Sequence, residues 1–244
     1  MTRWMMGCGV CWGLLSGCAW AADEAPPGVT GEVDGHYSFN QASYTTRELS
    51  LAADVAWPVQ HGELDGEFRF DREFIKLDGS PLEINTDKYD ANIKYKYFLD
   101  DSPYYAYLSP RMRYNRFGYY QRAQSVRGGG GRKFGGSPQW EINLELGSGY
   151  REAHLSDDAA ISETLYTMTV KARWAVSENL SLKFNWVNER SSREAYRTVT
   201  LGLRNKLTDK LGLKYEVLYR HTYPYDSLEK DGELQSEIGL SYSF

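Results

Sequence analysis

Apolar and polar side chains alternate along most of the chain after residue 28. The clearest run is 232–244, where one parity holds Leu234, Ile238, Leu240, Tyr242 and Phe244 and the other holds mainly charged or small polar residues. Because successive side chains of a β-strand point to opposite faces, this run predicts a strand with one apolar and one polar face. An ordinary sandwich strand shows the same pattern, so the rest of the chain must decide between the two architectures.

Twelve such runs follow one another along the chain. Connections between them tend to alternate between short turns and longer, more polar loops, and an even strand count places both termini on the same side. The predicted fold class is therefore all-β: a transmembrane antiparallel up-and-down β-barrel of 12 strands, with short periplasmic turns and longer external loops. The predicted strands are 29–39, 48–57, 64–72, 89–99, 104–114, 124–134, 140–151, 165–176, 180–189, 196–207, 211–221 and 232–244.

Aromatic side chains on the apolar parity sort toward the two ends of the predicted strands. The chain is 14% aromatic, with 19 Tyr and 7 Trp, which is more than a soluble domain has use for. Amphipathic rings at two levels are typical of a barrel that meets lipid headgroups at both interfaces. The predicted aromatic belt consists of Trp57, Tyr97, Trp140, Trp174, Trp186, Tyr219 and Tyr242.

Two predicted strands contain unusual residues. Pro110 has no backbone N–H, so we expect a β-bulge at that position. The run Gly128 to Gly131 would suit a phosphate-binding loop only with a following helix and a Lys-Ser/Thr pair, and both are absent. We interpret this run as a place of sharp wall curvature, or as space for something packed inside the barrel.

The first 21 residues predict a secretory signal peptide, followed by a short linker over 22–27 and the barrel over 28–244. Arg3 supplies the positive charge, 4–15 is the apolar core, and Ala19-Trp20-Ala21 fits a cleavage site. An alternative is a lipobox at Leu15-Ser16-Gly17-Cys18, which would place a lipidated Cys18 at the mature N-terminus. A chain cleaved after Ala21 has no thiol left, because the three cysteines are Cys8, Cys11 and Cys18.

Three segments resemble the salt-induced outer-membrane protein family (YdiY-like), a family of unknown function. They are Trp174-Ala-Val-Ser-Glu-Asn before a strand, Lys206-Leu-Thr-Asp-Lys-Leu-Gly-Leu-Lys, and the Ser-Tyr-Ser-Phe end. The resemblance covers essentially the whole mature chain and implies a barrel rather than a chemistry. The Gly-Asn-Thr element of that family's first hairpin is not seen between residues 39 and 44.

The terminal Phe244 also looks like the carboxy-terminal signal of bacterial outer-membrane barrels. That likeness implies the outer membrane of a Gram-negative cell as the location. The implied partners are its lipids and lipopolysaccharide, together with the barrel-assembly machinery, which reads the last strand. Oligomeric state is left open.

The inward parity is densely charged, and the signs segregate along the chain. An acidic sector on the last strand and the first three comprises Glu32, Asp34, Asp54, Asp65, Glu67, Asp71, Glu233 and Glu237. A basic sector on the remaining strands comprises Lys94, Lys96, Arg111, Arg113, Arg127, Lys171, Arg173, Lys183, Arg204, Lys214 and Arg220. Paired charges can seal such an interior, whereas a narrow water-filled pore would carry a transverse field that orients ionic solutes. Both interpretations stay open, because twelve strands lie between filled and open barrels.

A third hypothesis is lipid hydrolysis. Outer-membrane phospholipase A is also a twelve-stranded barrel with a His-x-Ser pair on one strand, and His36-Tyr37-Ser38 has that spacing, with Asn40 able to orient the imidazole. The pair falls on the inward parity, whereas lipid hydrolysis needs the outward one, so we predict no catalytic residues.

Other ligands find little support. The net charge of −5 without a basic stripe argues against nucleic acid. His61, His154 and His221 are too scattered for a metal site, no cofactor is predicted, and Asp157 and Asp158 are interpreted as solvated loop carboxylates.

Overall fold

The computed structural model describes residues 28–41, 44–77, 80–99, 102–118, 120–137, 139–155, 159–225 and 231–244. Within these segments the side chains of 39–41, 44, 77, 136, 224 and 231 are not described. The predicted signal peptide, linker and cysteines, the lipobox, the Asp157-Asp158 pair and the side chain of Asn40 therefore lie outside the described residues.

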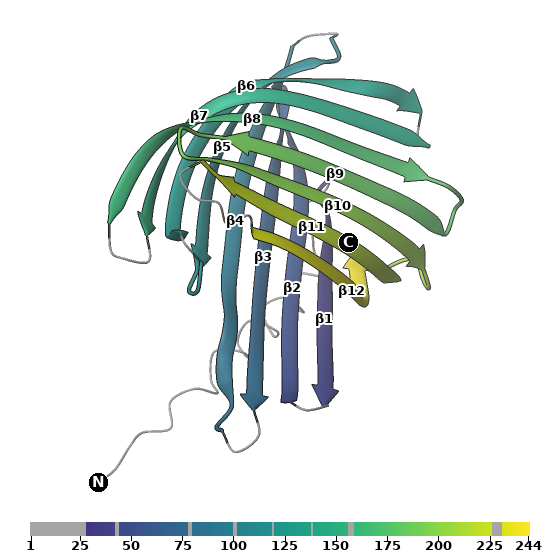
Figure 1. Cartoon of the computed structure of the whole chain (residues 1–244). Coiled ribbons are helices and arrows are strands. Elements are labelled where there is room, and N and C mark those ends of the chain that lie inside the picture. The colour runs from purple at the N-terminus through teal and green to yellow at the C-terminus, as the bar shows by residue number, and fades with distance from the viewer. Residues whose placement is uncertain are drawn as a thin grey trace.

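Twelve antiparallel strands close into one barrel, as predicted (Figure 1). Each strand pairs with its neighbours in the sequence, and the barrel closes where Glu32–Gly35 of β1 pair with Leu240–Ser243 of β12. Among the described residues, no helix has the length and hydropathy to cross a bilayer. The strands are β1 (Thr30–Gln41), β2 (Tyr44–Val59), β3 (Gly62–Leu77), β4 (Glu83–Phe98), β5 (Tyr104–Asn115), β6 (Tyr120–Ser137), β7 (Trp140–Leu155), β8 (Ala160–Ala175), β9 (Leu180–Arg190), β10 (Glu194–Lys206), β11 (Leu211–Pro224) and β12 (Asp231–Ser243).

The strands are longer than their sequence patterns indicate, and the connections are correspondingly short. At the end that holds both termini of the barrel, connections span two to five residues, and at the other end they span two to six. The first hairpin, for example, needs only residues 42–43 between strands. The contrast between the two ends is thus slight, because polar residues expected in loops continue the ladders instead.

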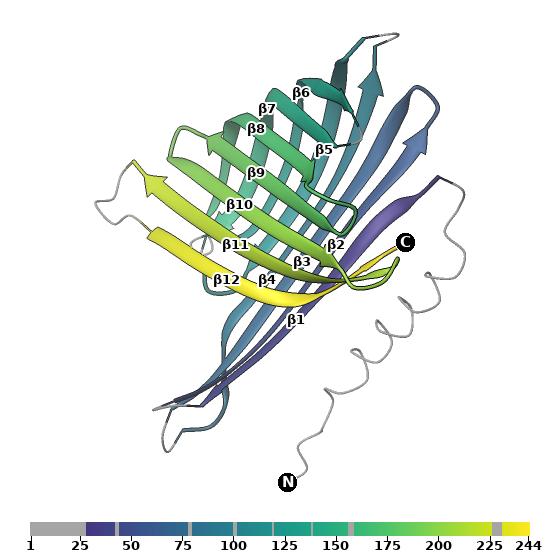
Figure 2. The same ribbon diagram turned by 90° about the vertical axis from the view of Figure 1, so that its right-hand side faces the viewer.

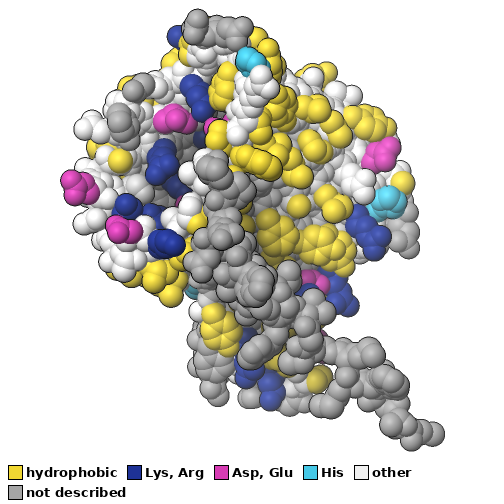
Figure 3. Space-filling model, turned by 180° about the vertical axis from the view of Figure 1, so that it is seen from behind, with side chains coloured by type: hydrophobic (Ala, Val, Ile, Leu, Met, Phe, Trp, Pro, Cys, Tyr) yellow, Lys and Arg dark blue, Asp and Glu magenta, His cyan; other side chains and the backbone are white. Residues whose placement is uncertain are grey.

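The wall is apolar outside and polar inside. Along β5, Tyr104 and Leu108 are exposed, while Tyr105, Tyr107 and Ser109 are buried. The buried set of the whole barrel includes Lys, Arg and Glu side chains, and the exposed set is rich in Leu, Tyr and Trp. Figure 3 shows hydrophobic side chains over much of the wall seen from behind, with charged side chains gathered chiefly to its left. This distribution of polar and apolar side chains is the reverse of that in a soluble domain, and it fits a protein surrounded by lipid.

The prediction of a β-bulge at Pro110 is wrong. On both sides of Pro110 the pairing of β5 with β4 keeps one register, from Asn92 opposite Arg111 to Tyr95 opposite Leu108. The two intervening pairs drop out of the ladder, as expected when one residue cannot donate a hydrogen bond. The proline is therefore accommodated by losing local pairing without inserting a residue.

The glycine run makes room for β5 side chains and for neighbouring backbone. A Cβ added at Gly131 would lie 2.3 Å from Cζ of Tyr105, and one at Gly147 of β7 would lie 2.2 Å from the hydroxyl oxygen of Tyr107. A Cβ at Gly129 would lie 2.1 Å from the carbonyl oxygen of Leu146, because β6 and β7 approach closely there. The interior-packing part of the interpretation from sequence fits these contacts.

Candidate functional site

The lumen is crossed by ion pairs that join strands far apart in the barrel. Lys171 on β8 lies 2.5 Å from Glu67 on β3, and these strands are five places apart around the closed wall. Other pairs join β11 to β3, β9 to β1 and β12 to β4, which are four places apart, and β11 to β1, which are separated by β12 alone. They are Arg69–Glu216 at 3.0 Å, Lys183–Glu32, Lys88–Glu233 at 3.5 Å and Lys214–Asp34. Opposite walls must therefore lie within the combined reach of two side chains.

Most residues of the predicted acidic sector find a cation from the predicted basic sector. Besides the pairs above, Lys96 lies 2.6 Å from Asp65, and Arg204 lies 3.0 Å from Glu32. Arg220 lies 3.1 Å from Glu233 and 3.9 Å from Asp71. The two sectors thus meet as contacting pairs rather than facing each other across open water.

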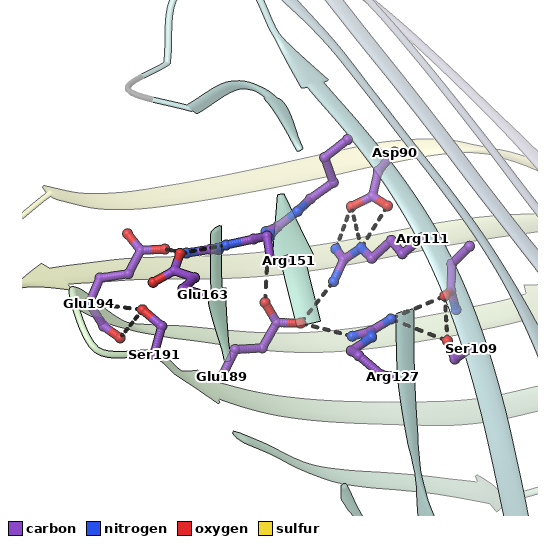
Figure 4. Close-up of polar contacts among 11 residues, drawn as sticks. Asp90, Ser109, Arg111, Arg127, Arg151, Glu163, Glu189, Ser191 and Glu194 are labelled. Atoms are coloured by element: carbon purple, nitrogen blue, oxygen red, sulfur yellow. Dashed lines mark hydrogen bonds and ion pairs between the residues drawn. The ribbon is translucent and has the colours of Figure 1, made fainter. Parts of the chain in front are cut away.

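The basic sector also contains carboxylates that the sequence analysis missed. Glu189 on β9 receives Arg127 at 2.8 Å, Arg111 at 3.1 Å and Arg113 at 3.6 Å, and Arg111 also pairs with Asp90 (Figure 4). Glu145 lies 2.5 Å from Lys94 and accepts a 3.0 Å hydrogen bond from the hydroxyl of Tyr105. Parity alone could have placed these acids inside, since each lies an even number of residues from an inward neighbour on its own strand.

A second buried cluster lies near the end of the barrel opposite the termini. Arg151 on β7 is 1% exposed and pairs with Glu163 on β8 and, at 2.8 Å, with Glu194 on β10 (Figure 4). Its guanidinium also lies 4.4 Å from the ring centroid of Tyr120. One cation here holds two carboxylates that would otherwise repel each other in a poorly solvated place.

Three predicted lumen residues stand apart from this network. Asp54 and Glu237 have no lysine or arginine within ion-pair distance among the described residues, and Arg173 is exposed near the barrel rim. Glu237 instead accepts hydrogen bonds from Gln235 at 2.5 Å and Ser50 at 3.4 Å. Neutral donors thus take the place of a cation beside Glu237.

Water reaches some of the crossing pairs. The side chains of Lys171 and Glu67 are 33% and 37% exposed, and that of Lys183 is 39% exposed. In contrast, the Lys94–Glu145 side chains are at most 8% exposed. The interior is therefore obstructed by side chains but contains water-accessible space beside its central pairs.

The residues of the predicted aromatic belt lie at strand positions that form two rows. Trp140 and Trp174 are direct cross-strand partners on β7 and β8, and both are exposed near the end that holds the termini, as are Trp57 and Tyr97. Tyr242, at the same end, is half-buried. Further along, the half-buried Trp186 and the exposed Tyr219 both oppose Val199, so they share a row across β9, β10 and β11.

The terminal Phe244 helps to close the barrel. Its backbone exchanges two hydrogen bonds with Gly31, at 3.0 and 3.1 Å. Its ring occupies the place where a Cβ on Gly31 would point, with Cζ 2.3 Å away. The last residue therefore covers the start of β1 on the outer side of the seam.

The His-x-Ser pair has other partners than a hydrolase would need. Nδ1 of His36 lies 2.6 Å from the carbonyl oxygen of Ile238, and the hydroxyl of Ser38 donates to Glu48 at 3.5 Å. The Ser38 hydroxyl is directed to Glu48, and among the described residues no hydrogen bond joins it to His36, as a serine activated by that histidine would need.

Solved structures with a similar fold are outer-membrane barrels. The NanC porin matches with a TM-score of 0.52 and 9% identity, covering 87% of this chain and 98% of that one. The COG4313 outer membrane channel from Pseudomonas putida F1 matches with a TM-score of 0.51 and 13% identity, covering 90% of this chain and 96% of that one. No curated protein matches the sequence. A family model described as a protein of unknown function, DUF481, matches residues 36–244.

Proposed function

The chain belongs to the DUF481 family of unknown function, and from this premise we propose that it is an outer-membrane β-barrel with a largely sealed interior. The fold and the apolar outer wall support a place in lipid. The observation that carries the sealed interior is the set of ion pairs across the lumen, above all Lys171–Glu67 and Arg69–Glu216.

These crossing pairs oppose passage because a solute must separate them or squeeze past them. Separating a fully buried pair costs about 3–5 kcal/mol, and these crossing pairs cost less because they are partly exposed. Successive pairs would each have to open, so a static barrel of this kind conducts poorly.

The second candidate is a narrow channel for small ions or polar solutes. The observation that favours it is the 33–39% exposure of Lys171, Glu67 and Lys183, which requires water beside the central pairs. The likeness of the fold to a porin and to an outer membrane channel fits this candidate as well.

Bilayer conductance separates the two candidates. The sealed barrel predicts no steady current steps from the refolded wild type across a salt series. It also predicts new steps when two of the crossing pairs are removed together, by Lys171→Ala, Glu67→Ala, Arg69→Ala and Glu216→Ala. The matched control combines Arg72→Ala and Asp87→Ala, which removes a 2.9 Å ion pair whose residues lie on the outward parity of β3 and β4. Steady ion-selective steps from the wild type that disappear when Arg111 and Arg113 are neutralised would reject the sealed interior.

We propose three finer roles. A function in the envelope under salt or other stress rests on the resemblance to the salt-induced family alone. Export rests on the residues of the N-terminal segment, and recognition of the last strand by the barrel-assembly machinery rests on the terminal Phe244. Growth of a deletion strain at high NaCl, complemented by the intact gene, tests the first of these roles. Equal growth of the deletion and parent strains would contradict it.

A non-enzymatic role fits the separate partners of His36 and Ser38. A micelle phospholipase assay with Ser38→Ala as control tests this point. Hydrolysis by the wild type that is lost in the variant would overturn it.

A further inference from the structure

The seam between β1 and β12 is paired over only part of its length. The ladder joins Glu32–Gly35 to Leu240–Ser243, next to the two hydrogen bonds between Gly31 and Phe244. Beyond this point, in the described part of the chain, β1 from His36 onward pairs only with β2, and residues 231–239 of β12 pair only with β11. Figures 1 and 2 both show the far ends of the two strands diverging. The wall is therefore incomplete over the half of the seam away from the termini.

A pocket on the lumen side lies at this incomplete part of the wall. Its lining includes inward residues such as Asp71 and Leu218, the outward Leu51, and Gly35 and Gly239 where the pairing ends. Its empty volume is about 490 Å³, including the open mouth. Most of the lining faces the lumen, and the outward Gly35 and Leu51 place the edge of the pocket at the gap in the wall.

Side chains bridge the gap on the lumen side. Gln235 on β12 donates hydrogen bonds to Glu48 on β2 at 2.9 Å and to Glu237 at 2.5 Å. His36 contacts the carbonyl oxygen of Ile238 at 2.6 Å, which satisfies one group that β1 would otherwise pair. The bridge is made of movable side chains, and backbone pairing does not hold it shut.

The outer margins of the gap are strongly apolar. Leu234, Tyr37 and Ile238 are 72%, 64% and 60% exposed. Unpaired backbone groups in hydrocarbon each cost several kcal/mol, so a bilayer leaves such a gap only where a polar group or water can reach it. An occupant with an apolar tail and a polar head would satisfy both sides at once.

We propose that the seam between β1 and β12 binds a single-chain amphiphile with a cationic head, whose tail lies against the outer margins in the bilayer. The proposal rests on the membrane location proposed above. The head would lie between Glu48 and Glu237, and the tail beside Leu234 and Ile238.

Charge complementarity selects a cationic head. Glu48 and Glu237 share the amide of Gln235, and their other donors are the neutral hydroxyls of Ser38 and Ser50. Among the described residues no lysine or arginine lies within ion-pair distance of either carboxylate. Elsewhere in the lumen most carboxylates contact at least one such cation. An ammonium entering from the seam would supply the missing partner.

The test uses wild-type protein in dilauroyl phosphatidylcholine vesicles and a dodecyl-dimethylammonium nitroxide, read by electron paramagnetic resonance. We expect an immobilised component that saturates at one probe per barrel, and less immobilisation of matched probes with a sulfate or an uncharged head. Combining Glu48→Gln with Glu237→Gln should weaken binding by about tenfold or more, the effect of losing charged hydrogen-bond partners. The control, Glu141→Gln with Glu178→Gln, removes the same charge from exposed positions at the other end and should change nothing.

A disulfide across the gap gives an independent check. Tyr37 and Ile238 would face each other if the ladder continued, so Tyr37→Cys with Ile238→Cys should cross-link slowly, and only when the seam closes. Binding should fall after oxidation and return after reduction.

Four results would overturn the proposal. They are equal immobilisation of all three probes, unchanged binding after the seam substitutions, a disulfide that forms fully without affecting binding, and a covalent dimer from Tyr37→Cys alone. The dimer would show a second copy at the open edge. Heat-dependent mobility in gels reports the folded barrel separately, so a wild type that fails to fold in vesicles would count against the membrane location and not against the ligand.

Discussion

The contact between Tyr105 and Gly131 offers a sharp test of how this barrel is packed. Gly131→Ala would place a methyl group 2.3–2.7 Å from three atoms of the Tyr105 side chain. The ring cannot move freely, because Tyr105 is 2% exposed and its hydroxyl donates to Glu145, which in turn pairs with Lys94. We therefore expect the substitution to disturb the ring and its hydrogen bond together.

The size of the effect follows from these two contacts. Overpacking a close-packed interior costs about 1–3 kcal/mol. Complete loss of a hydrogen bond to a charged group costs about 1.5–3 kcal/mol. The substitution weakens the bond between Tyr105 and Glu145, so it adds only part of this amount. A loss of about 2–4 kcal/mol in the free energy of unfolding is therefore expected.

The neighbouring glycine supplies the control. A Cβ at Gly130 would meet only the carbonyl oxygen of Tyr105, at an ordinary 3.7 Å. Gly130→Ala should leave stability unchanged or raise it by about 0.5–1 kcal/mol, because alanine loses less backbone freedom on folding.

Urea unfolding from lipid vesicles, followed by tryptophan fluorescence, measures both variants. In a Tyr105→Ala background the cost of Gly131→Ala should largely vanish. A double-mutant cycle would record this as a coupling free energy well above the roughly 0.5 kcal/mol within which independent sites add. Equal effects of Gly130→Ala and Gly131→Ala, or no coupling to Tyr105, would refute this account of the glycine run.

Two further predictions concern buried charge and closure of the seam. Arg151→Met should lower the free energy of unfolding by about 3–5 kcal/mol, because two carboxylates lose their cation, and adding Glu163→Gln and Glu194→Gln should restore part of it in the same urea titration. If the triple variant is no more stable than Arg151→Met, the destabilisation has another origin. Gly31→Val should displace the ring of Phe244 and reduce the folded fraction on heat-shift gels, and an unchanged fraction would contradict a role for that contact in closing the barrel.

Strand number, parity and closure could be predicted from the sequence because they depend only on local alternation and on an even count. The strand ends could not, since polar residues near Tyr44 and Tyr120 continue ladders that their own side chains do not specify. Pro110 shows the same limit, because the loss of one donor can be met by a bulge or by missing pairs, and the choice depends on both neighbouring strands.

Pairing across the lumen was also beyond the sequence. Whether Lys171 meets Glu67 depends on the stagger of strands five places apart and on how far the barrel is flattened. The same applies to the seam, where the register between the first and last strands is set only when the whole wall closes. The predicted sectors therefore identified many of the partners but not the contacts.

Those contacts change what the predicted transverse field can do. Two opposite charges in contact act on a distant ion as a dipole, so pairs such as Lys171–Glu67 contribute little net field along the lumen. The lumen carboxylates that have no such cation among the described residues include Asp54, Glu48 and Glu237, and they leave unpaired negative charge along the lumen. If the barrel conducts at all, it should prefer cations, and Asp54→Asn with Glu237→Gln should reduce that preference. A KCl gradient across a bilayer measures it as the reversal potential, and a preference for chloride would show that the pairs separate in the conducting state.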